Sequence, residues 1–239
     1  MKRNSKVNEN FYFSNKKQLL KFFNRIVKSV RELIIKKYGE SFANQLLNEL
    51  RNEFENILPQ LPYIGGKKKP YTIFIIGAGM YLAIFNVLKA HGKPFEEIAQ
   101  LIYDGTEAFY QKQPKWILRY IGKKIFKKSH INKVKLGANN PISPEDYVYS
   151  YIEGDGIDFD YGVDFKECAT WKFYNKLGCE ELNPILCSID YLNSRYMGYG
   201  LSRTKAIGYG DNICDFRMKK NGPTNVQLPD ILKRNNTNT

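Results

Sequence analysis

Four cysteines, all in the last third of the chain, carry the most specific chemistry in this sequence. They are Cys168, Cys179, Cys187 and Cys214. A thiolate is a nucleophile and a metal ligand, and its formation depends on its surroundings. Asp164 and Glu167 have the spacing of a helix capping box, which predicts that Cys168 lies in the first turn of a helix. Amides at a helix N-terminus would lower the pKa of that thiol.

The other cysteines are predicted to lie near charged side chains. Cys187 and Asp190 are three residues apart and share one side of a predicted helix. On the predicted last strand, Cys214 faces away from Asp215, and Arg203 lies on the partner strand. If the sheet packs on the helices, the three thiols at 168, 187 and 214 converge. The alternative for each cysteine is a small core residue, and Glu167 would then only complete its capping box.

No metal and no cofactor are predicted. The intervals between successive cysteines are ten, seven and twenty-six residues, which do not match common zinc-ligand spacings, and the chain has 2 histidines. The acidic segment around Asp155 and Asp158 lacks the ligand order of an EF-hand and is interpreted as a solvated strand face. A cysteine-rich metal site stays open as an alternative.

Helical periodicity dominates the first 130 residues. The apolar spacing predicts a helix from Asn15 to Gly39, a second over residues 42 to 57, a buried one from about 71 to 92, a fourth from 94 to 109 and a fifth from Pro114 to about Lys128. Residues 1 to 14 are predicted to be a mobile N-terminus. The region from 15 to 135 is therefore expected to be helical.

The period changes to two after Tyr147. A hairpin is predicted from residues 147 to 152 and 157 to 163, and a last strand pair from residues 201 to 207 and 213 to 218, with two helices between them. This order predicts an α+β fold in which the helical N-terminal half precedes a small antiparallel sheet covered by helices. The α+β region spans 140 to 220, residues 221 to 239 form a flexible tail, and 15 to 220 make one compact unit.

The excess of positive charge is local. The chain has 37 Lys and Arg against 24 Asp and Glu, and residues 115 to 135 contain eight of the basic residues and no acid. A basic amphipathic helix of this kind can lie on anionic lipid or follow phosphates. A solvated face is the preferred interpretation, with a weak anionic membrane contact through residues 115 to 128 as the alternative. No specific nucleic-acid partner is predicted, because no binding motif is present.

The sequence is expected to be cytoplasmic. No secretory apolar segment follows the basic start, and no early cysteine is available for a disulfide with the later ones. Residues 71 to 88 contain no charge and are just long enough to span a bilayer. Their polar residues and basic flanks on both sides favour a buried helix of a soluble domain. The oligomeric state is not predicted.

The motifs of the last third resemble those of one known family. Glu167-Cys168, the segment GCEELNPILCSIDY from Gly178 to Tyr191 and the segment LSRTKAIGYGDNICDFR from Leu201 to Arg217 are similar, in order, to the L-2-amino-thiazoline-4-carboxylic acid hydrolase family. The resemblance extends upstream through residues 62 to 66 and 92 to 94. The last segment also resembles the end of vinyl-reductase-type small-molecule-binding domains, which suggests a related fold.

The resemblance implies a hydrolase that opens a 2-amino-thiazoline ring to an N-carbamoyl cysteine, classed as acting on non-peptide C–N bonds. It implies that Arg203 binds the substrate carboxylate with Glu167 and Cys168 nearby. Cys187 or Cys214 would be the nucleophile or a ligand, and Asp190 or Asp215 the acid or base. The alternative is a noncatalytic small-molecule-binding or sensor domain with the thiols lining its pocket.

Overall fold

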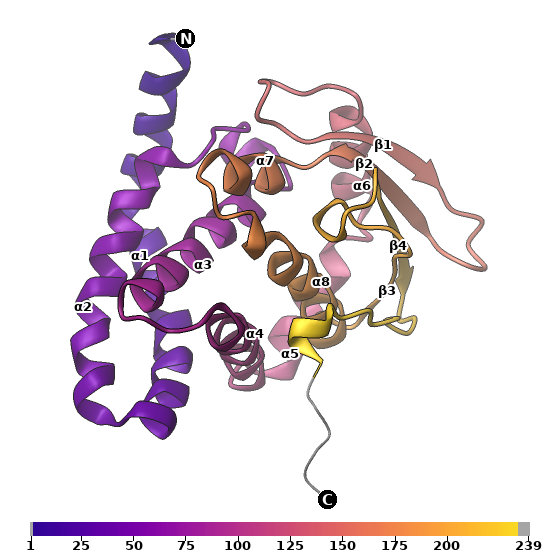
Figure 1. The fold of residues 1–239 in the computed structure, drawn as a ribbon. Helices are drawn as coiled ribbons and strands as arrows, with labels where there is room; N and C mark the ends of the chain where they lie inside the picture. Colours follow the sequence, from indigo (N-terminus) through magenta and orange to yellow (C-terminus); the bar gives the residue numbers. More distant parts are fainter. Residues whose placement is uncertain (1, 234–239) are drawn as a thin grey trace, which may run out of the picture.

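The computed structural model describes residues 2 to 233 and has an α+β fold. The helical half consists of α1 (Lys2–Tyr38), α2 (Glu40–Ile57), α3 (Thr72–Ala90), α4 (Phe95–Gln111), α5 (Lys115–Lys124) and α6 (Lys128–Gly137). The second half consists of β1 (Val148–Glu153), β2 (Tyr161–Glu167), α7 (Ala169–Lys176), α8 (Asn183–Met197), β3 (Tyr199–Ser202) and β4 (Cys214–Lys220). Figure 1 shows the α1 and α2 pair on one side of the molecule and the sheet on the other, with α3 and α8 between them. The predicted fold class is confirmed.

The first helix begins earlier than predicted. It starts at Lys2, and Asn15 lies inside it, where its side-chain amide donates a hydrogen bond to the Phe11 carbonyl. Tyr12, in the segment predicted to be mobile, is buried and its hydroxyl donates to the Pro62 carbonyl at 2.9 Å. The predicted cap at Asn15 is therefore wrong, because tertiary contacts continue the helix past a residue that favours helix starts.

The fifth predicted helix is two helices. Pro114 precedes α5, which ends at Lys124, and α6 starts at Lys128. On α5, Leu118 and Gly122 are the buried residues. A Cβ atom on Gly122 would lie 2.2 Å from the Met197 carbonyl oxygen, so the absence of a side chain lets α5 approach the end of α8.

Helix α3 occupies the centre of the molecule. It is long and apolar enough to cross a membrane, and 67% of its most apolar window is buried inside the protein. Its neighbours belong to both halves of the chain: the Tyr174 hydroxyl of α7 donates to the Ala78 carbonyl at 2.9 Å. The preferred interpretation of this segment as a buried core helix agrees with these contacts.

The four strands form an antiparallel sheet in the order β1-β2-β4-β3. The register pairs Phe165 with Cys214 and Val163 with Phe216, so these side chains share a face. The Tyr71 ring, just before α3, packs edge-on against Phe165 on this face. The apolar face of the sheet therefore closes over the helical half, as the alternation predicted.

The predicted hairpin is displaced. Strand β2 begins at Tyr161 rather than at Ile157. The Asp155 carboxylate accepts hydrogen bonds from the amides of Ile157 and Asp158, at 2.8 Å each, and this turn replaces strand pairing there. The alternation of apolar and acidic residues over 157 to 160 was thus a misleading strand signal.

The capping box is also wrong. Asp164 and Glu167 both lie in β2, where Asp164 pairs with Arg217 at 2.6 Å across the outer face of the sheet. Glu167 pairs instead with Lys172 on the exposed surface. The helix that follows has Cys168 as its N-cap residue.

The last strand pair is shorter than predicted. Strand β3 ends at Ser202, and residues 203 to 213 form a loop that contains a 3-10 turn over Ile207–Tyr209. We refer to this segment as the 207–209 turn. Arg203 therefore lies just past the strand end and not on a strand, which frees its side chain to enter the core.

Part of the predicted flexible tail is packed. The Asn225 amide donates to the Leu201 carbonyl at 2.9 Å, and Leu232 is buried in the core. Residues 234 to 239 of that predicted tail lie outside the described residues. The packed part runs past the loop that contains the 207–209 turn and helps to enclose it.

Candidate functional site

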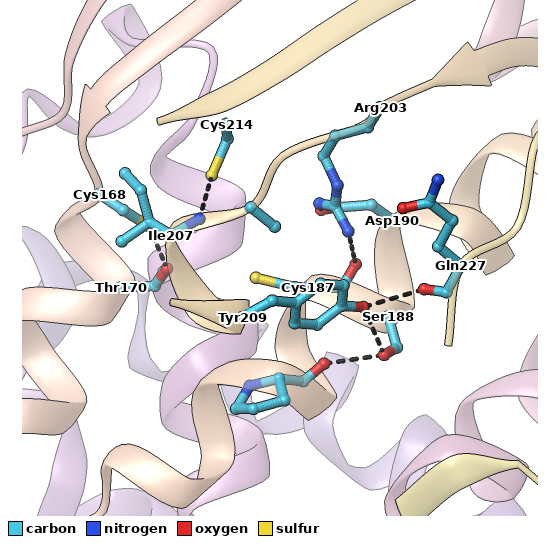
Figure 2. Close-up of polar contacts among 12 residues, drawn as sticks. Cys168, Thr170, Cys187, Ser188, Asp190, Arg203, Ile207, Tyr209, Cys214 and Gln227 are labelled. Carbon is cyan, nitrogen blue, oxygen red and sulfur yellow. Dashed lines mark hydrogen bonds and ion pairs between the residues drawn. The ribbon is translucent and has the colours of Figure 1, made fainter. Parts of the chain in front are cut away.

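The candidate site is centred on a buried ion pair between Arg203 and Asp190. Their side chains meet at 2.9 Å, with the arginine 1% exposed and the aspartate 20% exposed. The guanidinium also donates to the Cys187 carbonyl at 3.1 Å. Figure 2 shows these residues together on α8 and the loop after β3. The predicted placement of Cys187 and Asp190 on one side of a helix agrees with the structure, and the loop after β3 brings Arg203 to them.

Helix α8 positions two of the three residues. It has Pro184 in its first turn and ends at Met197, and the next residue, Gly198, has a φ of 74°, a left-handed conformation suited to glycine. Apolar residues such as Ile185, Ile189 and Leu192 face the core. Cys187 and Asp190 lie together beside that stripe and meet the loop that carries Arg203.

Burial and the Arg203 charge have opposing effects on the pKa of Asp190. Burial raises the pKa of Asp190 to about 6, and the positive charge and hydrogen bond of Arg203 partly offset this increase. Burial would lower the pKa of Arg203, but Asp190 and the other titratable groups around the guanidinium together raise it above its ordinary value, so the arginine stays charged. A carboxyl group with a pKa near 6 can accept and return a proton at neutral pH.

Three aromatic rings surround the Arg203 guanidinium. The ring centroids of Tyr191, Phe216 and Tyr209 lie 4.9, 5.0 and 5.5 Å from its central carbon. The Tyr209 hydroxyl is within 3.1 Å of the Ser188 hydroxyl and donates to the Gln227 carbonyl at 3.2 Å. This aromatic enclosure keeps water away from the ion pair and strengthens its electrostatic interaction.

The 207–209 turn lies between two of the thiols (Figure 2). The Ile207 amide donates to the Cys214 sulfur at 3.1 Å. A Cβ atom on Gly208 would lie 2.6 Å from the Cys187 sulfur, so only glycine fits there without displacing a neighbour. Cys187 and Cys214 therefore contact successive residues of the same turn from opposite elements.

The thiols are protonated at neutral pH in this conformation. Burial raises the pKa of Cys187 well above its usual value, with Arg203 acting in the opposite direction, and burial raises the pKa of Cys214 to about 12. Burial also raises the pKa of Cys168, although hydrogen bonds with Thr170 and nearby amides lower it. The predicted activation of Cys168 by a helix N-terminus is wrong because desolvation exceeds the effect of those amides.

Two predicted residues lie apart from the centre. Asp215 faces the outside of the sheet, because successive strand residues point to opposite faces, and its carboxylate accepts bonds from the Thr204 and Lys205 amides at 2.9 and 2.6 Å. These bonds hold the loop after β3. Glu167 is exposed and paired with Lys172. Cys168 is nearer, since it interacts electrostatically with Cys187 and Cys214.

Sequence reasoning missed several tyrosines of the site. Burial raises the pKa of Tyr147, Cys168 and Asp190 add to this increase, and a hydrogen bond with Thr170 opposes it. Tyr191 and Tyr209 flank Arg203. A signal for Tyr209 was present in the Gly-Tyr-Gly sequence of the matching segment, whereas no spacing distinguishes Tyr147 among 17 tyrosines.

Arg203 is enclosed in this conformation, with 1% of its side chain exposed. The surface hollows found on α1 beside Arg51, and between α1 and the start of α3, are not lined by Cys187, Asp190 or Arg203. Within residues 2 to 233, no group of three or more His, Cys, Asp or Glu side chains is arranged to hold a metal ion. The Tyr209 ring of the 207–209 turn is one of the groups that cover the Arg203 guanidinium.

The fold and the site define an α+β protein with a buried centre of thiol, carboxylate and guanidinium groups. The protein-family model described as L-2-amino-thiazoline-4-carboxylic acid hydrolase matches residues 74 to 218, more than half of the chain. The chain therefore belongs to this family, which confirms the resemblance. Searches of curated proteins and of solved structures found no significant match.

Proposed function

We propose that this protein hydrolyses a small cyclic amidine such as 2-amino-thiazoline-4-carboxylate. Membership of the family supports the substrate class. The observation that carries the proposal is the Asp190–Arg203 pair beside Cys187, because it combines a proton acceptor with a cation in an enclosed site. Its partner is then a small molecule. The four free thiols support a reducing, cytoplasmic setting.

The reaction adds water across one ring bond. The water oxygen bonds to C2 of the ring and the C2–S bond breaks. One water proton passes to the leaving sulfur and the other to the ring nitrogen, as C2 becomes a carbonyl carbon. The product is an N-carbamoyl cysteine, which keeps the bond from C2 to the ring nitrogen. This proposed route breaks a C–S bond, whereas the class expected from the resemblance acts on non-peptide C–N bonds.

Asp190 takes the role of acid and base in this proposal. With a pKa of about 6 it is mostly ionised at pH 7 and accepts a proton from the attacking water. The protonated Asp190 carboxyl then donates a proton to the leaving sulfur. Water is the proposed nucleophile, rather than a cysteine, because burial keeps the Cys187 and Cys214 thiols protonated.

Arg203 is the proposed partner of the substrate carboxylate. Its guanidinium donates hydrogen bonds to Asp190 and to the Cys187 carbonyl, and a guanidinium has five N–H donors, so further donors remain for a ligand. The carboxylate reaches this buried side chain after the 207–209 turn moves aside. Cys168 and Cys187 then contribute contacts at the wall of the site.

The direct test measures thiol release. The purified protein is incubated with 2-amino-thiazoline-4-carboxylate, and the new thiol of the product is titrated with a disulfide reagent against a substrate-free blank. We expect release by the wild type and a loss of roughly 10²–10⁴ in turnover in Asp190→Asn. Asp158→Asn, which alters an exposed carboxylate in the turn between β1 and β2, is the matched control and is expected to keep its turnover.

The noncatalytic alternative gives a different result. Saturable binding of the same compound without thiol release, measured by calorimetry, would replace the hydrolase by a ligand-binding or sensor module. Equal turnover in wild type and Asp190→Asn would reject the assigned role of Asp190.

A further inference from the structure

We propose that helix α5 binds the surface of an anionic lipid membrane. Three large apolar side chains of this helix face the solvent: Trp116 is 73% exposed, Tyr120 is 53% exposed and Ile121 is 40% exposed. Exposed aromatic and aliphatic side chains beside lysines are typical of helices that lie in the membrane interface. This surface is separate from the proposed catalytic centre.

The opposite side of α5 packs against the rest of the protein. Leu118 and Gly122 are buried, and the close approach of Gly122 to the Met197 carbonyl fixes the helix against α8. The apolar face predicted from the sequence is therefore divided: one part packs inside, and Trp116, Tyr120 and Ile121 remain outside. A helix fixed in this way presents its outer side chains without the cost of ordering its backbone on binding.

The charge around these side chains fits anionic lipid. Lys115, Lys123 and Lys124 are exposed, and none of them forms an ion pair within the described part of the chain. The Lys124 ammonium lies 4.5 Å from the Tyr120 ring centroid, which places charge and aromatic surface side by side. The sequence has no acidic residue between Lys112 and Pro144.

An anionic lipid surface accounts for both the basic and the apolar exposed side chains of α5, whereas a nucleic acid accounts mainly for the basic ones. Phosphates of either partner attract the lysines. An exposed aliphatic side chain such as Ile121 gains free energy by entering the boundary of the acyl chains, whereas a phosphate backbone offers it no apolar contact. The combination of aliphatic, aromatic and basic side chains on one helix therefore favours the membrane.

The test is sedimentation of the full-length protein with two kinds of vesicle, phosphatidylcholine alone and phosphatidylcholine with phosphatidylglycerol. We expect binding to the anionic vesicles, weakening as salt rises. Lys123→Gln with Lys124→Gln is expected to lower the partition coefficient roughly 25-fold, about fivefold for each lysine. Lys36→Gln with Lys176→Gln gives the same net charge from other exposed helix positions and is expected to bind like the wild type.

A second measurement tests whether the exposed Trp116 side chain enters the membrane interface. In a Trp171→Phe background, Trp116 is the remaining tryptophan, and its emission is expected to shift to shorter wavelength with anionic vesicles. No binding to these vesicles, equal loss in both lysine pairs, or an unshifted spectrum would overturn the proposal. So would binding to a nucleic-acid duplex that depends on Lys123 and Lys124 while vesicle binding does not.

Discussion

At the scale of single residues, Asp190 has the most unusual environment in the site. Its carboxylate is enclosed by α8, the Arg203 side chain and buried tyrosines, and it contributes to the raised pKa of Tyr81 and Tyr199. Arg203 compensates only part of the cost of removing this charge from water. The folded protein therefore binds a proton at Asp190 more tightly than the unfolded chain does.

This difference predicts a pH dependence of stability. Because the pKa is raised from 3.8 to about 6, the stabilising contribution of the protonated carboxyl is complete below about pH 4. It is lost as the pH rises through 6 and amounts to at most about 3 kcal/mol. Asp190→Asn has no such group, so the difference in unfolding free energy between wild type and variant should change over this range. Urea titrations at several pH values measure it, and a constant difference from pH 4 to 7 would contradict the prediction.

The prediction of these residues from sequence was uneven. Helical spacing alone places Cys187 and Asp190 on one side of α8, and strand alternation alone separates Cys214 from Asp215. The ion pair with Arg203 was not predictable, because it depends on a loop that leaves β3 at Ser202 and turns inward. The thiol pKa of Cys168 was predicted in the wrong direction because burial was unknown.

At the scale of elements, the contact of α5 with α8 depends on a missing side chain. Gly122 faces the Met197 carbonyl oxygen directly, and backbone cannot rotate away as a flexible side chain can. Gly77, in α3, has no atom within 4 Å of the position of a Cβ. Both glycines are in helices and differ mainly in their surroundings. Comparing a substitution at each position therefore distinguishes the effect of close packing on stability from the effect of helix propensity.

Gly122→Ala is expected to destabilise the protein by about 1–3 kcal/mol, because α5 must move away from α8. Gly77→Ala is expected to stabilise it by up to about 1 kcal/mol through helix propensity. Thermal unfolding of both variants measures these effects. If Gly122→Ala matched Gly77→Ala in stability, the close packing of α5 on α8 would be refuted.

At the scale of the whole molecule, the two halves share one hydrophobic core. Buried residues of α1 to α4, the sheet and α7 to α8 belong to a single cluster, and Leu232 of the C-terminal segment joins it. The bond from Tyr174 to the Ala78 carbonyl links the halves at the centre. The unit from 15 to 220 predicted from sequence stays a prediction, which unfolding can test.

The two tryptophans lie in different halves, Trp116 on α5 and Trp171 on α7. A shared core predicts one cooperative transition, so variants that keep only one tryptophan should report the same denaturation midpoint. Each variant is compared with its own circular dichroism curve to correct for the effect of the substitution. Separate midpoints would show that the halves unfold independently.

Local patterns in the sequence were enough to determine the helical first half, the position of α8, the antiparallel sheet and the family. These features follow from periodicity and short motifs, which neighbouring residues along the chain define. The tertiary structure alone decided which charges meet, where the strands end and which thiols are buried. Arg203, Asp190 and the 207–209 turn meet only when β3, α8 and the C-terminal segment pack together. Pairing energies and pKa values depend on those distant neighbours, so sequence spacing could not reveal them.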